Sequence, residues 1–279
     1  MTRLTTDDII LIADELEAYD DELVAKTGCT LSGIACQAAG VTESEIKKII
    51  ADARVGVVPI TFGRGVIEGF SETVAGIVSH VGCKAFVTQA ADVAGLAEAF
   101  EKNADIIMLS DDDRFVAIHL QSRQVIDNAA ATGRGFAAGL SLMGGGLEKK
   151  NVLVVGCGPV GIAATQALVE QGSVVSIYDI NASRSDDLSN KIRQLSDTKI
   201  TIVKELDDAL TDHQFIVDAT PAAEIIRKHH ISPQTCISAP GVPLGLDKEA
   251  QAEISNRLLH DPLQIGVATM IACAMKFRL

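Results

Sequence analysis

A glycine-rich hexapeptide in the second half of the chain has the residue types and spacing of a phosphate-binding loop. The hexapeptide is Gly156-Cys157-Gly158-Pro159-Val160-Gly161. It follows the apolar run 151–155 and precedes a helical pattern over 162–171. In such a loop the first glycine permits a tight turn, the second lets a pyrophosphate approach the main chain, and the third lets the helix lie close to the strand. Proline suits the first helical turn, whose N–H groups attract phosphate. The hexapeptide therefore predicts a dinucleotide site.

An acidic residue stands where the adenosine ribose of a dinucleotide would need it. Asp179 follows the next predicted strand, 173–178, and lies 23 positions after Gly156. A carboxylate there accepts hydrogen bonds from the ribose hydroxyls and repels a 2′-phosphate, which favours NAD over NADP. Arg184 lies near enough in sequence to complicate that choice. A glycine turn without a cofactor is the alternative, but strand, glycines, helix and acid together favour NAD.

Two further loops follow predicted strands of the same half. They are Ala219-Thr220-Pro221, after the run 214–218, and Ala239-Pro240-Gly241, after the run 235–238. Ligands of open α/β sheets lie outside the carboxyl ends of the strands, so we expect both loops to line the nicotinamide half of the cofactor. Ordinary turns also use proline and glycine, and position favours the binding role.

Charged and aromatic residues follow two apolar runs in the first half. Asp111-Asp112-Asp113 comes after the run 106–109, where a carboxylate can hold an ammonium group or accept its proton. A solvated turn or a helix cap is equally open, and magnesium would need further oxygen ligands. The loop Phe62-Gly63-Arg64-Gly65 predicts either a phosphate cradle or a tight strand-to-helix turn.

The elements that must position these residues alternate between strand and helix, which is typical of α/β folds with parallel sheets. Helical patterns come first: one over 5–27 ends at Gly28, and one from a capping box at Thr42–Glu45 ends near Ala53. The other elements predicted in the first half are strands at 55–60, 85–88 and 106–109, helices ending near 82 and 102, and an edge strand at 115–120. Those predicted in the second half are a helix at 127–142, strands at 151–155, 173–178, 199–203, 214–218 and 235–238, and a helix at 264–275.

The pattern predicts two domains with a boundary at the glycines 144–146. Residues 1–145 would form a small substrate-binding α/β domain with a short parallel sheet. Residues 146–262 would form an NAD-binding, doubly wound domain of the Rossmann type. Residues 263–279 would return as a helix that packs on the first domain.

Composition excludes several classes of protein. A formal net charge of -13 repels nucleic acids and anionic membranes and favours cationic ligands, although solubility alone could also account for it. The six cysteines lack a CxxC pair, and the six histidines are scattered along the sequence, so neither disulfides nor a metal are expected. The polar start, 1–8, lacks a signal-peptide pattern, and the apolar run 265–275 is too short to span a bilayer. We therefore expect a cytoplasmic protein.

Strings along most of the chain resemble those of the pyrrolysine synthase family, the dehydrogenases that act last in pyrrolysine biosynthesis. The matching strings are 55–61, Gly63, Gly65, 69–72, Asp92-Val93, Asp111-Asp112, Phe115, 219–221, 240–243, 262–263, 265–266 and 268–270. The resemblance implies NAD-dependent oxidation of the terminal amine-bearing carbon of 3-methyl-D-ornithyl-N6-L-lysine. Loss of ammonia, cyclisation and loss of water then give L-pyrrolysine.

The resemblance also implies a pocket for this cationic substrate, formed by Leu4, Ile60, Phe62, Arg64 and Asp111. Asp111 is the catalytic candidate: it would hold the cationic end of the substrate, and either it or a bound water would take the proton. Smaller polar residues occupy the positions of Phe62 and Arg64 in the family, so the pocket departs from the family pattern there. Arg64 could instead pair with the lysine carboxylate.

Two other functions remain open at this point. One is another NAD(P)-dependent dehydrogenase of an amino or hydroxy acid, and the other is a non-catalytic NAD(H)-sensing protein. A sensor would bind the dinucleotide without turnover, and no DNA-binding segment is evident. The oligomeric state is open as well, a homodimer included.

Overall fold

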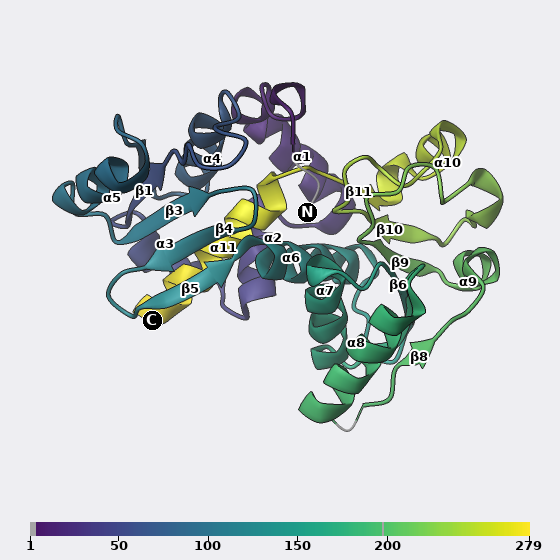
Figure 1. The fold of residues 1–279 in the computed structure, drawn as a ribbon. Helices are drawn as coiled ribbons and strands as arrows, with labels where there is room; N and C mark the ends of the chain where they lie inside the picture. The colour runs from purple at the N-terminus through teal and green to yellow at the C-terminus, as the bar shows by residue number, and fades with distance from the viewer. Residues whose placement is uncertain (1–3, 197) are drawn as a thin grey trace.

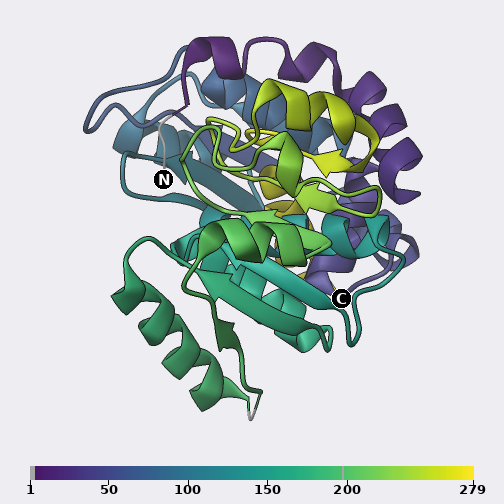
Figure 2. The same cartoon turned by 90° about the vertical axis from the view of Figure 1, so that its right-hand side faces the viewer.

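The computed structural model describes residues 4–196 and 198–279, which form two lobes that are each built on one β-sheet (Figure 1). The first lobe carries β1 to β5 and the second carries β6 to β11, as two views at right angles show (Figure 2). Among these described residues, no helix is both long and apolar enough to cross a bilayer.

The sheet of the first lobe has five strands in the order β2-β1-β3-β4-β5. Their bounds are Arg54–Val58 (β1), Lys84–Val87 (β2), Ile106–Ser110 (β3), Phe115–His119 (β4) and Gln124–Asp127 (β5). β1, β2 and β3 are parallel, as predicted, whereas β4 and β5 are antiparallel additions. The strand predicted at 115–120 is present as β4, but its predicted edge position is wrong, because β5, which was not predicted, pairs with its outer side.

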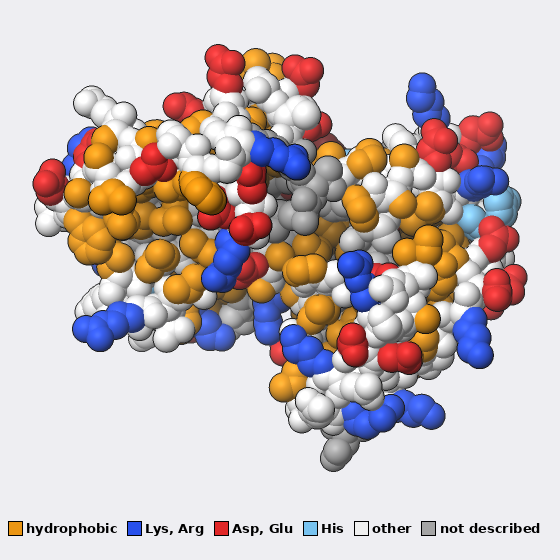
Figure 3. Space-filling view, viewed as in Figure 1, with side chains coloured by type: hydrophobic (Ala, Val, Ile, Leu, Met, Phe, Trp, Pro, Cys, Tyr) orange, Lys and Arg blue, Asp and Glu red, His pale blue; other side chains and the backbone are white. Residues whose placement is uncertain are grey.

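Helices cover the two faces of this sheet unequally. The helices of the lobe are α1 (Leu16–Thr27), α2 (Leu31–Ala39), α3 (Glu43–Ile50), α4 (Phe70–His80) and α5 (Asp92–Glu101). α4 packs with the C-terminal helix on the face that carries Val55 and Val57, and α5 packs on the opposite face, against Val58. The outer side of α5 leaves Val93 81% and Phe100 55% exposed. Figure 3 shows hydrophobic side chains gathered over this part of the molecule.

The segment predicted as one helix over 5–27 is divided into three pieces. Two 3-10 turns, η1 (Thr6–Asp8) and η2 (Ile12–Asp14), precede α1. The carboxylate of Asp8 accepts the Thr5 N–H at 2.7 Å, and such local side-chain bonds compete with a continuous helix. Gly28 ends α1 in the left-handed conformation, as predicted.

The second lobe contains a six-stranded sheet of order β11-β10-β9-β6-β7-β8 in which every pair is parallel. The strands are Asn151–Val155 (β6), Val174–Tyr178 (β7), Thr201–Ile202 (β8), Phe215–Asp218 (β9), Cys236–Ser238 (β10) and Leu258–Leu259 (β11). The helices and 3-10 turns are Pro159–Glu170 (α7), Ala182–Leu195 (α8), Leu206–Asp212 (α9), Lys228–His230 (η3), Lys248–Glu253 (α10) and Ser255–Arg257 (η4). The strand order reverses between β6 and β9, and ligands of such sheets bind at this switch point.

α6 (Asn128–Met143) joins the two lobes, and α11 (Gln264–Met275) packs against it. α6 contacts α7, β9 and β10 of the second lobe and also β4 and β5 of the first. α11, which a short 3-10 turn follows (η5, Lys276–Arg278), packs on α2, α4 and α6. The C-terminal helix therefore lies against the first lobe, beneath β4 and β5 in Figure 1.

Candidate active site

The glycine loop has the geometry that its sequence predicts. Gly156 leaves β6 at φ 94°, in the left-handed region, where a Cβ would lie 2.8 Å from the Ala219 carbonyl oxygen. A Cβ on Gly161 would lie 1.8 Å from the Gly156 carbonyl oxygen, so glycine is required for α7 to approach the strand. Gly158, the N-cap of α7, has no atom within 4 Å of its Cβ position. The loop is therefore closely packed on its inner side and open at Gly158, where a pyrophosphate would approach.

Asp179 lies against this loop. One carboxylate oxygen accepts the Cys157 N–H at 2.8 Å, and the other accepts the Asn181 N–H at 2.8 Å. A carboxylate oxygen has two lone pairs, so each retains capacity for a ribose hydroxyl. The Cys157 thiol is buried, and its pKa is raised by that burial. Cys157 therefore contributes its main-chain N–H to the loop and not a reactive thiolate.

The two loops predicted to line the nicotinamide half adjoin the glycine loop. Thr220 Cγ2 is 3.0 Å from the Cβ position of Gly156, and the Thr220 carbonyl oxygen is 2.0 Å from that of Gly241. Three loops at the carboxyl ends of β6, β9 and β10 are thus in contact. They comprise the predicted residues Gly156–Gly161, Ala219–Pro221 and Ala239–Gly241. An open cradle at Gly158, backed by these loops and by Asp179, fits an NAD-type dinucleotide.

Asp111 begins the turn between β3 and β4. Its Oδ1 accepts the N–H groups of Asp113 and Arg114 at 2.9 and 2.7 Å, and its side chain is exposed. These backbone hydrogen bonds, the one from Arg114 first, lower the pKa of the Asp111 carboxyl. A carboxylate that stays charged can hold an ammonium group, but a lowered pKa makes it a weaker proton acceptor at neutral pH.

Two further acids, Asp112 and the first residue of α5, Asp92, hold the loop after β1 in place. Asp112 Oδ2 accepts the Arg64 N–H at 2.8 Å. Asp92 accepts the N–H of Thr61 at 2.8 Å and its hydroxyl at 2.5 Å. These contacts join positions 48 and 31 residues apart, so no local sequence pattern could have predicted them. Asp92 and Asp112 therefore hold this loop in place, and Asp112 differs in role from Asp111.

The five residues of the expected substrate pocket lie in different surroundings. Phe62, 76% exposed, and Arg64 lie in the loop after β1, and Asp111 follows the adjacent strand β3. Leu4 packs against the core that contains Val55 and Val57. Ile60 packs with Val58, whose side chain points to the opposite face of the sheet. The structure thus brings the three polar or aromatic loop residues to one edge and places the two aliphatic ones on different cores.

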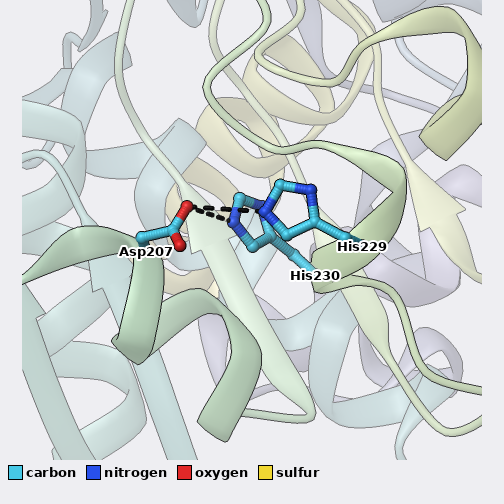
Figure 4. A group of neighbouring side chains, drawn as sticks. All are labelled: Asp207, His229 and His230. Atoms are coloured by element: carbon cyan, nitrogen blue, oxygen red, sulfur yellow. Dashed lines mark hydrogen bonds and ion pairs between the residues drawn. The ribbon is translucent and has the colours of Figure 1, made fainter.

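Three potential metal ligands meet on the second lobe, so the description of the histidines as scattered is wrong (Figure 4). Asp207 Oδ1 lies 2.8 Å from His230 Nε2 and 3.5 Å from His229 Nε2. His230 is buried, and its Nδ1 accepts the Arg227 N–H at 3.0 Å. A neutral ring that accepts at Nδ1 carries its proton on Nε2 and donates it to Asp207. This proton occupies the metal-binding lone pair, so the triad joins α9 to η3 as a structural contact.

Two stretches of the chain match known protein families. "Pyrrolysine biosynthesis protein PylD, N-terminal domain" matches residues 8–126, and "Alanine dehydrogenase/PNT, C-terminal domain" matches residues 125–232. The pyrrolysine synthase of Methanosarcina acetivorans is 31% identical over 97% of this chain and 98% of its own. That of Methanosarcina barkeri is 32% identical over 97% of each chain.

Two solved dehydrogenase structures have a similar fold. Quinate dehydrogenase from Corynebacterium glutamicum, in complex with NAD, has a TM-score of 0.54 and 14% identity over 81% of this chain and 93% of its own. Shikimate dehydrogenase from Aquifex aeolicus has a TM-score of 0.53 and 16% identity over 81% of this chain and 90% of its own. At these identities the similarity shows the fold, which agrees with the predicted α/β class and Rossmann-type domain.

The full-length match to two curated relatives decides the family, and the dinucleotide cradle agrees with it. The protein is a dehydrogenase of pyrrolysine biosynthesis, as the sequence predicted. The chain belongs to the pyrrolysine synthase family.

Proposed function

We propose that the protein uses NAD+ to convert 3-methyl-D-ornithyl-N6-L-lysine into L-pyrrolysine. The substrate's terminal –CH2–NH3+ group would lose a hydride to NAD+ and one proton. Water would then replace the nitrogen, releasing ammonium and leaving an aldehyde, and the ornithyl α-amine would condense with the aldehyde and release water. The single observation that carries this proposal is the full-length similarity to the Methanosarcina synthases.

The choice of NAD rests on Asp179, whose carboxylate lies beside the glycine loop, 2.8 Å from the Cys157 nitrogen. A fixed negative charge there accepts two ribose hydroxyls and opposes a 2′-phosphate. Arg184 is exposed on α8, and its positive charge would attract a 2′-phosphate and so favour NADP. The proximity of Asp179 to the loop supports NAD.

The substrate's cationic end is assigned to Asp111. Its carboxylate is exposed, charged and located at the carboxyl end of β3, next to the strand that leads to Phe62 and Arg64. The chain's formal charge of -13 supports the attraction of an ammonium substrate over longer distances.

The test is incubation with NAD+ and 3-methyl-D-ornithyl-N6-L-lysine, followed by NADH absorbance and mass spectrometry. We expect NADH together with a product lighter than the substrate by one ammonia and two hydrogens. Efficient turnover of another amino or hydroxy acid but not of this substrate would identify a different dehydrogenase. NADH binding without turnover of any of these compounds would identify a sensor.

The variant Asp111→Asn tests the residue assignment. Asparagine keeps an oxygen for the turn's two N–H groups but removes the charge, so turnover should fall about 100-fold, on the scale of one lost charge-assisted contact of about 3 kcal/mol. Asp113→Asn in the same turn is the matched control and should retain turnover. Equal turnover of both variants would remove Asp111 from the mechanism.

A further inference from the structure

A histidine not considered above lies at the ligand edge of the second lobe's sheet. His260 directly follows β11, and the parallel register that pairs Ser238 with Leu259 places it beside Ala239. The predicted nicotinamide loop, Ala239–Gly241, begins there. Gly241 in turn contacts Thr220, which contacts Gly156. His260 is therefore the next neighbour in a continuous series of loops at the carboxyl ends of β6, β9, β10 and β11.

One ring nitrogen of His260 has a fixed partner. Nδ1 lies 2.6 Å from the Ala239 carbonyl oxygen. A carbonyl only accepts, so Nδ1 carries the proton, and in the neutral ring Nε2 presents a free lone pair. Nε2 hydrogen-bonds no residue within 4–196 or 198–279, and the side chain is partly exposed. This is the tautomer that a general base requires.

The segment that carries His260 is held from the first lobe. The buried Asp261 accepts the Tyr19 hydroxyl at 2.6 Å and the Leu263 N–H at 2.9 Å. Lys26 Nζ donates to the Leu258 carbonyl oxygen at 2.7 Å. Both contacts from α1 flank His260 in sequence, so the imidazole is fixed where the two lobes meet. A base positioned there could reach a substrate bound between the first lobe's loops and the nicotinamide.

We propose that His260 is the general base of the reaction and takes the proton from the substrate's terminal ammonium group. This inference rests on the proposed function. One N–H bond of the –CH2–NH3+ group breaks, the proton moves to His260 Nε2, and the electron pair stays on nitrogen. The bound dinucleotide supplies the hydride acceptor for the adjacent carbon. The imidazolium then releases its proton to solvent through its exposed side, so the ring returns to its starting state.

This assignment divides the work between two residues. Asp111, whose pKa is lowered, would hold the charged nitrogen, and His260 would remove its proton. The imidazole of His260 is suited to the second task because Nδ1 donates to the Ala239 carbonyl oxygen and leaves the Nε2 lone pair to accept the proton. In the alternative, purely structural role, His260 only positions the Ala239 loop. The test must distinguish this role from that of a general base.

The test compares His260→Asn with His260→Ala. The asparagine amide can still donate to the Ala239 carbonyl but cannot accept a proton. With 3-methyl-D-ornithyl-N6-L-lysine and NAD+, we expect kcat of His260→Asn to fall about 100-fold or more, the usual contribution of a general base. The Kd for NADH, measured by its fluorescence, should stay within about 3-fold of wild type because the loop contact remains. Added imidazole should restore part of the turnover of His260→Ala.

The dependence of kcat/KM on pH gives the second measurement. A general base acts only when it is unprotonated, so kcat/KM of wild type should fall as pH is lowered, and this acid limb should be absent from His260→Asn. The charged group that interacts with His260 is Asp261, which the Tyr19 hydroxyl contacts, and Lys26 binds the Leu258 carbonyl oxygen two residues before His260. A limb that persists in His260→Asn but disappears in Asp261→Asn would assign the titration to Asp261 and overturn the proposal.

The remaining outcomes also decide the matter. If wild type is active and His260→Asn keeps its kcat, His260 is no base, and the proposed function stands. If His260→Asn loses NADH affinity in proportion to turnover, its role is structural. If wild type forms no product while binding NADH, the proposed function fails and this inference fails with it.

Discussion

Asp218, at the end of β9, is a carboxyl group in an unfavourable place. Its side chain is fully buried. Oδ1 accepts the Thr220 hydroxyl at 2.7 Å and the Thr220 N–H at 3.1 Å, while Oδ2 has no partner among residues 4–196 and 198–279. Burial raises the pKa of Asp218 to about 6, against an ordinary value of 3.8, because desolvation outweighs the two hydrogen bonds. The folded state therefore favours the protonated acid.

Replacing Asp218 with Asn should remove this penalty. Because the folded pKa lies above the unfolded pKa, the acid's stabilising contribution is complete below pH 3.8 and is lost as pH rises through about 6. The two pKa values differ by about 2. As pH rises through this range, the free energy of unfolding of wild type should therefore fall by about 3 kcal/mol, whereas that of Asp218→Asn should not. Part of the net gain at any single pH is offset, because the asparagine NH2 group in place of Oδ2 has no acceptor.

The measurement is urea unfolding of both proteins at pH 4, 5, 6 and 7. At each pH the free energy of unfolding of the variant is subtracted from that of wild type. Any cost of the substitution that does not depend on pH cancels when these differences are compared across pH. We expect the free energy of unfolding of wild type to fall by about 2 kcal/mol relative to the variant between pH 4 and 7. A relative change under about 0.5 kcal/mol would show that burial does not raise the pKa of Asp218.

Four other substitutions test the cofactor loop and the contact between the lobes. Gly158→Ala should fold normally, since its Cβ position is open, but should weaken NAD binding at least about 10-fold (1.4 kcal/mol) in calorimetry; unchanged affinity would move the pyrophosphate elsewhere. Gly161→Ala should lower the free energy of unfolding by about 2 kcal/mol, because its Cβ would overlap a carbonyl oxygen. Asp179→Asn should reduce the preference for NAD over NADP about 10-fold in kcat/KM, through loss of a charged acceptor worth about 1.5 kcal/mol. Tyr19→Phe should cost about 2 kcal/mol in denaturant unfolding, because it leaves the buried Asp261 without its hydroxyl donor.

The elements that local patterns predicted well share one property. Their structure follows from a few adjacent residues. β6 is an uninterrupted buried run after Asn151, the glycine loop directly continues it, and Thr42 and Glu45 form the capping box expected from their spacing. Such features need no knowledge of distant residues.

Other elements depend on partners that are remote in sequence. α2 (Leu31–Ala39) is buried on most sides and made mainly of small residues, so it lacks the one-sided periodicity of a surface helix. β11 has only two residues and exists through its pairing with β10. The candidate base His260 is recognisable only through that pairing, because its carbonyl partner is 21 residues away. Asp112 likewise resembled its neighbour Asp111 until the Arg64 N–H distinguished it.

The arrangement of the two lobes depends on residues that touch no ligand loop. On α6, a Cβ on Gly135 would lie 2.5 Å from Ile265 Cγ2, and one on Gly139 would lie 2.3 Å from Leu259 Cδ2. A Cβ on Gly266 of α11 would lie 2.5 Å from the Thr132 hydroxyl oxygen. Since α6 contacts both sheets, a larger side chain at these glycines would push α6 away from α11 or from β11. The distance between Asp111 on one lobe and His260 on the other thus depends on the packing of α6. A methyl group at Gly135 or Gly266, where the nearest atoms belong to Ile265 and Thr132, should therefore lower turnover without touching either residue.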